Sequence, residues 1–380
     1  MGKTRALIHL DRFARNLEHV RSRIGANRLI CMPVKADAYG HGAIPIAEAG
    51  LRGGAAFLGV SRIQEGLELR KAGITAPIVL LSLPLPEELD EMAEGSLTPF
   101  VSDKEFAQRA DAAASKAGII LPVHIKIDTG MGRLGCRPED APELACFIAS
   151  MKSLVCTGTA THLSSADSLA EADRITTQKQ LRCFKSAVEG IKQAGMDPGI
   201  VHAANSGAVL LHKDAYLDMV RPGILLYGYP PSAELKDLAP VEPVMELETV
   251  LVFLKKVKKG ESISYGGTWT APEDRVIGTL PVGYGDGLPR GISGNFQVLI
   301  QGKPYPLVGR ICMDHCMVDL GSGSSIKRWD TVTVFGGNEG ALDAGDIASR
   351  IHTIPYEITC NINKRVQRVY IDKGRESNFS

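Results

Sequence analysis

The sequence predicts an α/β protein, in which an N-terminal (β/α)8 barrel of the TIM type precedes a C-terminal, mainly-β domain. Three observations lead to this prediction. The 380 residues exceed what a single hydrophobic core usually serves. Apolar stretches alternate regularly with amphipathic segments up to about residue 230. Beyond a proline-marked connection, the helical periodicity largely gives way to short β-rich runs.

The barrel is expected over residues 11–240. Asp11 is interpreted as the N-cap of a first helix, whose apolar positions recur at helical spacing from Phe13 to Ile24. Apolar stretches then mark the predicted strands, near 29–34, 56–60, 78–83, 98–101, 122–127, 154–161, 200–203 and 219–227. Helical segments such as 62–71 and 104–117 separate these strands, and eight alternations favour a closed barrel over an open sheet.

Short β-rich runs mark the second domain, which is expected over residues 241–380. They lie at 245–257, 262–265, 275–282, 296–301, 316–320, 331–335 and 366–371, with glycine-containing turns between them. Residues 1–10 contain a short apolar strand of their own. We expect this strand to pack with the C-terminal domain.

Charge and hydropathy exclude several classes of function. Lys+Arg and Asp+Glu both total 43, so neither a basic nor an acidic excess indicates a nucleic-acid partner or disorder. A small neutral or zwitterionic ligand fits this balance better than a polymer does. Residues 1–11 lack a signal-peptide core, and no apolar run is long enough to cross a membrane. We therefore expect a cytoplasmic protein without a membrane partner.

The eight cysteines fall at irregular spacings, mostly inside apolar runs, which is typical of reduced and buried thiols. Cys312, His315 and Cys316 lie within five residues and could be imagined as metal ligands. No second pair of ligands at zinc-finger spacing accompanies them. We therefore expect no metal.

Candidate functional side chains directly follow the predicted strands, where barrels of this type carry their chemistry. They are Lys35, Tyr39, Arg133, His162, Asn205, Ser206, Arg221, Gly223 and Ile224. Taken alone, a strand-end lysine usually keeps its amine in water, and an arginine usually forms a surface ion pair. Taken together, the hydroxyl groups, two backbone amides and a helix N-terminus suit a dianionic phosphate. A lysine that can form an imine then points to pyridoxal phosphate (PLP).

Several motifs carry a family resemblance that covers almost the whole chain in order. They are residues 34–42 (VKADAYGHG), 128–135 (DTGMGRLG), 205–206 (NS), 221–223 (RPG), 264–266 (SYG), 283–287 (GYGDG) and 312–314 (CMD). By these motifs the chain resembles the alanine racemases, PLP enzymes of fold type III. The resemblance implies interconversion of L- and D-alanine, with D-alanine supplied for peptidoglycan and serine as a candidate secondary substrate.

The resemblance also implies the catalytic pair. Lys35 matches the Schiff-base lysine that serves the D enantiomer, and Tyr265 matches the opposite-face base that serves the L enantiomer. Racemisation requires two such groups, because a planar carbanion must be protonated from either side. His162 with Arg221 resembles a relay toward Tyr265. Arg221 also matches the residue at the pyridine nitrogen, where a permanently protonated arginine weakens the electron sink and disfavours side reactions.

The remaining family positions concern binding. The resemblance implies phosphate contacts from Tyr39, Ser206, Gly223, Ile224 and Tyr356, and places His162 and Asn205 beside the cofactor. Arg133 is expected near the cofactor's phenolic oxygen and the substrate carboxylate, which Met313 contacts through its backbone. Tyr284 and Tyr356 are expected to narrow the access corridor. Lys126 matches a position that is carbamylated in some members, although a plain lysine fits the sequence equally well.

Tyr265 and Met313 lie in the expected β domain, far along the chain from Lys35. In the family such residues reach the site of the other subunit, so the resemblance implies a head-to-tail homodimer with shared active sites. By itself, Tyr265 would be interpreted as a strand tyrosine with its hydroxyl at the rim. Departures from the family pattern at Asp37, Gly207, Gly285 and Trp269 remove no catalytic group.

Two other functions share part of these motifs. A non-catalytic PLP carrier built on a single barrel would lack the residues after 240, and hence Tyr265. A PLP-dependent decarboxylase of the same architecture generally pairs the pyridine nitrogen with a carboxylate, whereas Arg221 stands here. Racemisation is therefore the favoured function.

Overall fold

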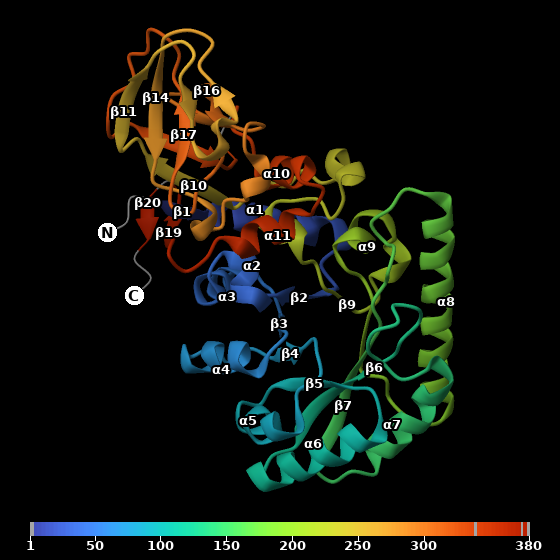
Figure 1. Ribbon diagram of the computed structural model, residues 1–380. Coiled ribbons are helices and arrows are strands. Elements are labelled where there is room, and N and C mark those ends of the chain that lie inside the picture. Colours follow the sequence, from blue (N-terminus) through green and yellow to red (C-terminus); the bar gives the residue numbers. More distant parts are fainter. Residues whose placement is uncertain (1–3, 338–339, 374, 378–380) are drawn as a thin grey trace.

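The computed structural model describes residues 4–337, 340–373 and 375–377. A closed parallel barrel forms one part of the molecule and an extended, mostly antiparallel sheet forms the other, as Figure 1 shows with the barrel below and the sheet above. The prediction of a TIM-type barrel followed by a mainly-β domain is confirmed.

Eight parallel strands close the barrel. They are β2 (Leu29–Pro33), β3 (Phe57–Val60), β4 (Ile78–Leu80), β5 (Thr98–Val101), β6 (Leu121–Lys126), β7 (Leu154–Ala160), β8 (Ile200–His202) and β9 (Met219–Val220). Each strand pairs with the next, and β9 returns to β2 with Leu29 opposite Met219. The last predicted apolar stretch, 219–227, is a strand only over its first two residues, because a 3-10 helix begins at Ile224.

Helices cover the outside of the barrel. They are α1 (Leu10–Ile24), α3 (Ala43–Arg52), α4 (Ile63–Lys71), α5 (Leu89–Glu94), α6 (Lys104–Ala117), α7 (Ala141–Ala149), α8 (Glu171–Gln193) and α9 (Ser206–Leu211). The apolar face predicted for the first helix is buried, with Phe13 and Leu17 almost inaccessible. That helix begins at Leu10, so Asp11 lies in its first turn and is not the N-cap; its carboxylate pairs there with Arg15.

The second part is a ten-stranded sheet, whose order is β11-β14-β17-β16-β15-β18-β10-β1-β19-β20. Its strands are β1 (Arg5–His9), β10 (Met245–Val250), β11 (Phe253–Val257), β14 (Arg275–Leu280), β15 (Gln297–Ile300), β16 (Lys303–Val308), β17 (Cys316–Asp319), β18 (Thr331–Phe335), β19 (Gln367–Asp372) and β20 (Arg375–Ser377). A separate hairpin pairs β12 (Ser262–Ile263) with β13 (Trp269–Thr270).

Besides the segment 221–244 between β9 and β10, two features tie the barrel to this sheet. Strand β1, which directly precedes the first barrel helix, lies between β10 and β19, with Arg5 opposite both Glu248 and Gln367. Helices α10 (Ala344–Arg350) and α11 (Pro355–Asn361) lie between the sheet and the barrel (Figure 1). Helix α11 packs against the segment that follows β2, which brings Tyr356 to the end of the barrel where Lys35 lies.

In the part of the chain that the structure describes, no helix combines the length and apolar character needed to span a bilayer. The same described residues contain no group of three or more histidine, cysteine or acidic side chains arranged to hold a metal ion. Cys316 is buried in β17, while Cys312 lies before that strand and donates its backbone N–H to the His315 carbonyl at 2.8 Å.

Candidate active site

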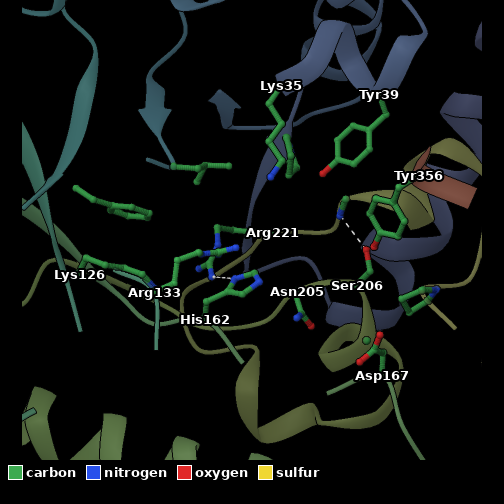
Figure 2. Close-up of a pocket in the computed structure, with 16 residues that line it drawn as sticks. Lys35, Tyr39, Lys126, Arg133, His162, Asp167, Asn205, Ser206, Arg221 and Tyr356 are labelled. Carbon is green, nitrogen blue, oxygen red and sulfur yellow. Dashed lines mark hydrogen bonds between the residues drawn. The ribbon is translucent and has the colours of Figure 1, made fainter. Parts of the chain in front are cut away.

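A left-handed turn directly after β2 positions two of the predicted site residues, Lys35 and Tyr39. Residues Ala36–Tyr39 have φ between 51° and 56° and ψ between 36° and 51°, and none of them is glycine. This conformation costs about 1–2 kcal/mol at each L-residue. It turns Lys35 and Tyr39 toward the same pocket, so that their polar ends enter it from one side (Figure 2).

Hydrogen bonds from outside the turn keep it in this conformation. The amide of Ala36 donates to Glu65 Oε1 at 2.7 Å, and the amide of Ala43 donates to Asp37 Oδ1 at 2.7 Å. Gly40 has φ +84°, and a Cβ there would lie 2.1 Å from the Thr359 carbonyl oxygen of α11. Only glycine allows that approach, which sets α11 directly against the turn.

Glu65, which was not singled out from the sequence, also binds the start of α4. Its Oε2 accepts hydrogen bonds from Ser61 N and Arg62 N at 2.7 and 3.1 Å, at the start of α4. One carboxylate therefore joins the ends of two neighbouring barrel strands. Its charge also acts on Lys35, whose pKa is lowered chiefly by burial and further by Arg133, against the opposing effect of Glu65.

A pocket of about 190 Å³ lies at this end of the barrel. The predicted site residues that line it are Lys35, Tyr39, Lys126, Arg133, His162, Asn205, Ser206, Arg221, Gly223 and Tyr356. Asp167 also lines it, on the side of Asn205 (Figure 2). Ile224 is fully buried directly after Gly223 and is not among the lining residues.

Neutral donors converge at one end of the pocket. Gly223 N donates to Ser206 Oγ at 2.9 Å, and a Cβ built on Gly223 would lie 2.8 Å from the Tyr39 hydroxyl. The rings of Tyr39 and Tyr356 are 5.7 Å apart, and burial raises the pKa of both phenols, so both remain protonated donors. These groups form a cradle suited to an anion. The side chain of Asn205 instead caps α9, accepting from Ala208 N at 3.0 Å.

Arg221 begins a buried chain of hydrogen bonds. Its Nη1 lies 2.6 Å from His202 Nδ1, and His202 Nε2 lies 3.0 Å from His124 Nδ1. Because arginine only donates, His202 must accept at Nδ1, carry its proton on Nε2 and donate to His124. Burial, followed by the Arg221 charge, lowers the pKa of His202 well below its ordinary value and that of His124 to about 4. Both imidazoles are therefore neutral.

The charge of Arg221 has no acidic partner among the residues that the structure describes. Its Nη2 donates to the Thr161 carbonyl at 2.6 Å, and His162 Nδ1 lies 3.4 Å from the same nitrogen (Figure 2). Burial lowers the pKa of Arg221 to about 10, so the guanidinium stays protonated at neutral pH. Burial and this cation also hold the pKa of His162 well below its usual range.

Two residues of this chain, His124 and His202, were not singled out from the sequence. Their signal was weak: each is a histidine on an apolar strand, and such a residue is more often buried in a core than functional. In the structure, His202 accepts from Arg221 at Nδ1 and donates from Nε2 to His124 Nδ1. This pair of hydrogen bonds fixes which nitrogen of His202 faces Arg221.

The loop after β6 is closed at its base. Asp128 N donates to the Cys136 carbonyl and Cys136 N donates to the Lys126 carbonyl, both at 2.9 Å. Inside the loop, the Asp128 carboxylate accepts from the amides of Gly130, Met131 and Gly132. This closure presents Arg133 at the pocket while leaving its side chain exposed.

Lys126 ends β6 and is almost fully buried, with Nζ 5.6 Å from the centre of the Phe100 ring. Burial is the main cause that lowers its pKa well below the ordinary lysine value, and the cations of Arg221 and Arg133 add to it. A lowered pKa enlarges the uncharged fraction of the amine, which is its nucleophilic form.

The remaining predicted residues lie on the second part of the molecule and do not line this pocket. Tyr265, Met313 and Tyr284 are 69%, 53% and 42% exposed. The loops that carry the last two are joined, since Tyr284 N donates to the Cys312 carbonyl and Gly285 N to the Met313 carbonyl, at 3.1 and 2.8 Å. The structure therefore brings the barrel residues together and leaves these three on a surface.

Comparison with known proteins gives the family. The family model for the N-terminal domain of alanine racemases matches residues 8–231, and that for the C-terminal domain matches residues 244–370. An alanine racemase of Treponema denticola is 47% identical, over 98% of this chain and 99% of the relative; one of Treponema pallidum is 43% identical, over 98% and 100%.

Solved structures agree with the sequence comparison. The alanine racemase of Clostridium difficile superposes with a TM-score of 0.93 at 36% identity, covering 100% of this chain and 98% of that chain. The alanine racemase of Bacillus anthracis with bound L-Ala-P superposes with a TM-score of 0.91 at 33% identity, covering 100% and 97%. The chain therefore belongs to the alanine racemase family.

Proposed function

We propose that this enzyme interconverts L- and D-alanine with PLP as its cofactor, using Lys35 and Tyr265 as two acid/base groups on opposite faces of the substrate. The observation that carries the proposal is the shared pocket of Lys35, the donor cradle at Gly223 and the buried cation of Arg221. Lysine is the residue that binds PLP covalently, and the cradle suits its phosphate.

The residues present fit PLP. A Cβ at Gly223 would fill the cradle beside the Tyr39 hydroxyl. The hydroxyl groups there can donate to a dianion, and the Gly223 amide can do so once it releases Ser206 Oγ. In this proposal Tyr39, Ser206, Gly223, Ile224 and Tyr356 hold the phosphate. Arg221 meets the pyridine nitrogen, Arg133 the phenolic oxygen and the substrate carboxylate, and His162 and Asn205 lie beside the ring.

Bound PLP would supply the sink for the electron pair left when the α-proton leaves. Lys35 Nζ takes or returns that proton on one face. Its lowered pKa is suited to this exchange, since a general base works best with a pKa near the working pH. The Tyr265 hydroxyl does the same on the other face, and Met313 with Arg133 holds the carboxylate so that the Cα–H bond lies between the two groups.

Arg221 sets the limits of this chemistry. It donates to neutral histidines and backbone carbonyls, so its own proton is not easily passed on. A nitrogen facing this guanidinium keeps less positive charge than one facing a carboxylate, which favours return of the proton over side reactions. The same feature opposes the decarboxylase alternative.

We also infer a head-to-tail homodimer with two shared sites. Three predicted site residues, Tyr265, Tyr284 and Met313, are exposed in the single chain, and large exposed apolar side chains near one another indicate an interface. In this assignment residues 11–240 form the PLP-binding barrel and residues 241–380 the β domain, with the strand in residues 1–10 packed on the latter. Each β domain then completes the partner's pocket.

The biological setting is part of the same proposal. D-Alanine made by a cytoplasmic enzyme would supply peptidoglycan, and the corridor tyrosines Tyr284 and Tyr356 would admit alanine and, more slowly, serine. The lowered pKa of Lys126 supports its carbamylation, because an uncharged amine is the form that reacts with carbon dioxide. A carbamate there would be an anion able to hold Arg133.

A substrate panel tests the activity. All common L-amino acids are incubated with the PLP-loaded enzyme, and the enantiomers are separated by chiral chromatography. We expect turnover confined to alanine, with slower turnover of serine. Turnover dominated by lysine or arginine would contradict the corridor assignment, and release of carbon dioxide would contradict racemisation as the activity.

Exchange in D₂O tests the two faces separately. In Tyr265→Phe we expect D-alanine to exchange its α-proton without inversion, because Lys35 still serves that face, while L-alanine neither exchanges nor racemises. Racemisation should fall by roughly 100- to 10,000-fold. Tyr305→Phe, a change on β16 away from the site, is the matched control. Racemisation by Tyr265→Phe at the wild-type rate would refute the two-base assignment.

A further inference from the structure

The residue immediately before Tyr265 has an unusual backbone conformation. Ser264 has φ 67° and ψ −175°. Residues in this region of φ and ψ are almost always glycine, because a side chain is strained there. Glycines follow at 266 and 267, both with positive φ, yet position 264 itself carries a side chain.

Contacts with the segment before β17 hold Ser264 in this conformation. Its hydroxyl donates to the Arg310 carbonyl at 2.6 Å, and its Oγ lies 3.5 Å from Cys312 Sγ. A Cβ at Gly309 would lie 2.8 Å from Ser264 Cβ and 2.9 Å from the Ile263 carbonyl. The hairpin can therefore lie this close only because residue 309 is glycine.

The strain has a consequence for the neighbouring tyrosine. The Tyr265 side chain is 69% exposed, so packing within its own chain does little to set its direction. The direction of its Cα–Cβ bond must then come from the backbone at residues 264–267. A glycine at 264 would adopt this conformation freely but would also leave it freely, whereas a strained serine tied by its hydroxyl is restricted.

We propose that Ser264 is a positioning residue, whose strained backbone and hydrogen bond to Arg310 hold the Tyr265 hydroxyl in place for proton transfer on its face of the substrate. This inference rests on the proposed role of Tyr265 as the second base. It assigns no contact with substrate to Ser264 itself.

Three substitutions test the proposal in the PLP-loaded dimer. Ser264→Gly removes both the strain and the hydroxyl, Ser264→Ala removes the hydroxyl alone, and Ser264→Thr retains it. The matched control is Ser262→Ala in the same hairpin, which removes a hydroxyl 3.1 Å from Thr270 Oγ1. Each variant is followed in D₂O by α-proton exchange of D- and L-alanine and by racemisation, alongside its melting temperature.

We expect Ser264→Gly to lower racemisation roughly 10- to 100-fold, because a displaced catalytic group loses about this much rate. Exchange of the D-alanine α-proton should stay close to wild type, since Lys35 serves that face. The melting temperature should not fall, because the substitution relieves strain. Ser264→Ala should show an intermediate loss. Ser264→Thr, which keeps the hydroxyl, should lose less racemisation than Ser264→Ala, and Ser262→Ala should behave like the wild type.

Two results would overturn the proposal. Racemisation by Ser264→Gly within about twofold of wild type would show that Ser264 does not position Tyr265. Equal loss of D-alanine exchange and of racemisation would show that the substitution damages the whole site. Tyr265→Phe separates this failure from that of the proposed function. If Tyr265→Phe loses racemisation selectively and Ser264→Gly does not, only the role of Ser264 is wrong. If Tyr265→Phe racemises normally, both are wrong.

Discussion

The cradle at Gly223 allows a quantitative prediction. In Gly223→Ala the new methyl carbon would lie 2.8 Å from the Tyr39 hydroxyl oxygen and 3.5 Å from the ring carbon that bears it. The first distance is too short for any Cβ, so the phenol must shift, and a phosphate in the proposed cradle would lose part of its hydrogen bonds to the hydroxyl and to the Gly223 amide. A hydrogen bond to a charged group contributes about 1.5–3 kcal/mol. A partial loss of two such bonds should cost about 3 kcal/mol, or roughly 100-fold in PLP affinity.

The assay is a titration of cofactor-free enzyme with PLP, followed by absorbance. A double-mutant cycle with Tyr39→Phe locates the clash: without the phenolic oxygen, the nearest remaining atom of residue 39 is at an ordinary contact distance. The combined loss should therefore be smaller than the sum of the separate losses by about 1 kcal/mol or more. Gly323→Ala, where a Cβ meets nothing within 4 Å, is the control. PLP affinity of Gly223→Ala within about threefold of wild type, or strict additivity in the cycle, would refute the steric argument.

Three further predictions follow from other buried groups. Burial lowers the pKa of His124 to about 4, below the unfolded value of ~6.5. Between these two pH values His124 is protonated in the unfolded chain but neutral in the native chain. Stability is therefore lost as pH falls from 6.5 toward 4. The difference in unfolding free energy between wild type and His124→Gln, measured by urea unfolding, should shrink by about 2.5 kcal/mol between pH 7 and pH 4.5. A difference that does not change with pH would contradict this. Glu65→Gln removes a charge that raises the pKa of Lys35, so amine-reactive reagents should label Lys35 faster at pH 7 in the cofactor-free variant, as peptide mass spectrometry can measure; unchanged labelling would exclude the charge effect. A thiol reagent at pH 8 should modify the exposed Cys146 but leave Cys31, whose pKa burial raises to about 12, until the protein unfolds.

The barrel strands and the residues after them could be predicted from the sequence, because a parallel strand buried on both faces is a continuous apolar run. Functional residues of such barrels follow the carboxyl ends of the strands, so the predicted strands also predicted Lys35, His162 and Arg221 as site residues. The structure brings these three to one pocket. The left-handed turn over Ala36–Tyr39 could not be predicted. No glycine lies within it, and its conformation is fixed by Glu65 and α11, which are distant in sequence.

Strand β16 was missed for a different reason. It contains Pro304 and Pro306, and proline normally argues against a strand. In the sheet these two residues pair only with β15, opposite Leu299 and Gln297, while Leu307 and Val308 make the pairing with β17. The missing N–H groups therefore fall where β16 has no neighbour on its second side. A sequence cannot show which half of a strand is left without a neighbour.

Strand β1 has a consequence for how the protein is made. It is synthesised before the barrel, yet its partner on one side, β19, lies at Gln367–Asp372, beyond the barrel and most of the sheet. At about 5–20 residues per second, the ribosome needs roughly 20 to 70 seconds to reach that strand. Throughout this interval β1 has an unpaired edge, although the barrel that follows it can already close through β9. A gene split after residue 240 would leave both edges of β1 permanently open, because β10 and β19 both lie beyond the split. A soluble isolated barrel should therefore require removal of residues 1–9, and an isolated β domain should require that strand to be supplied.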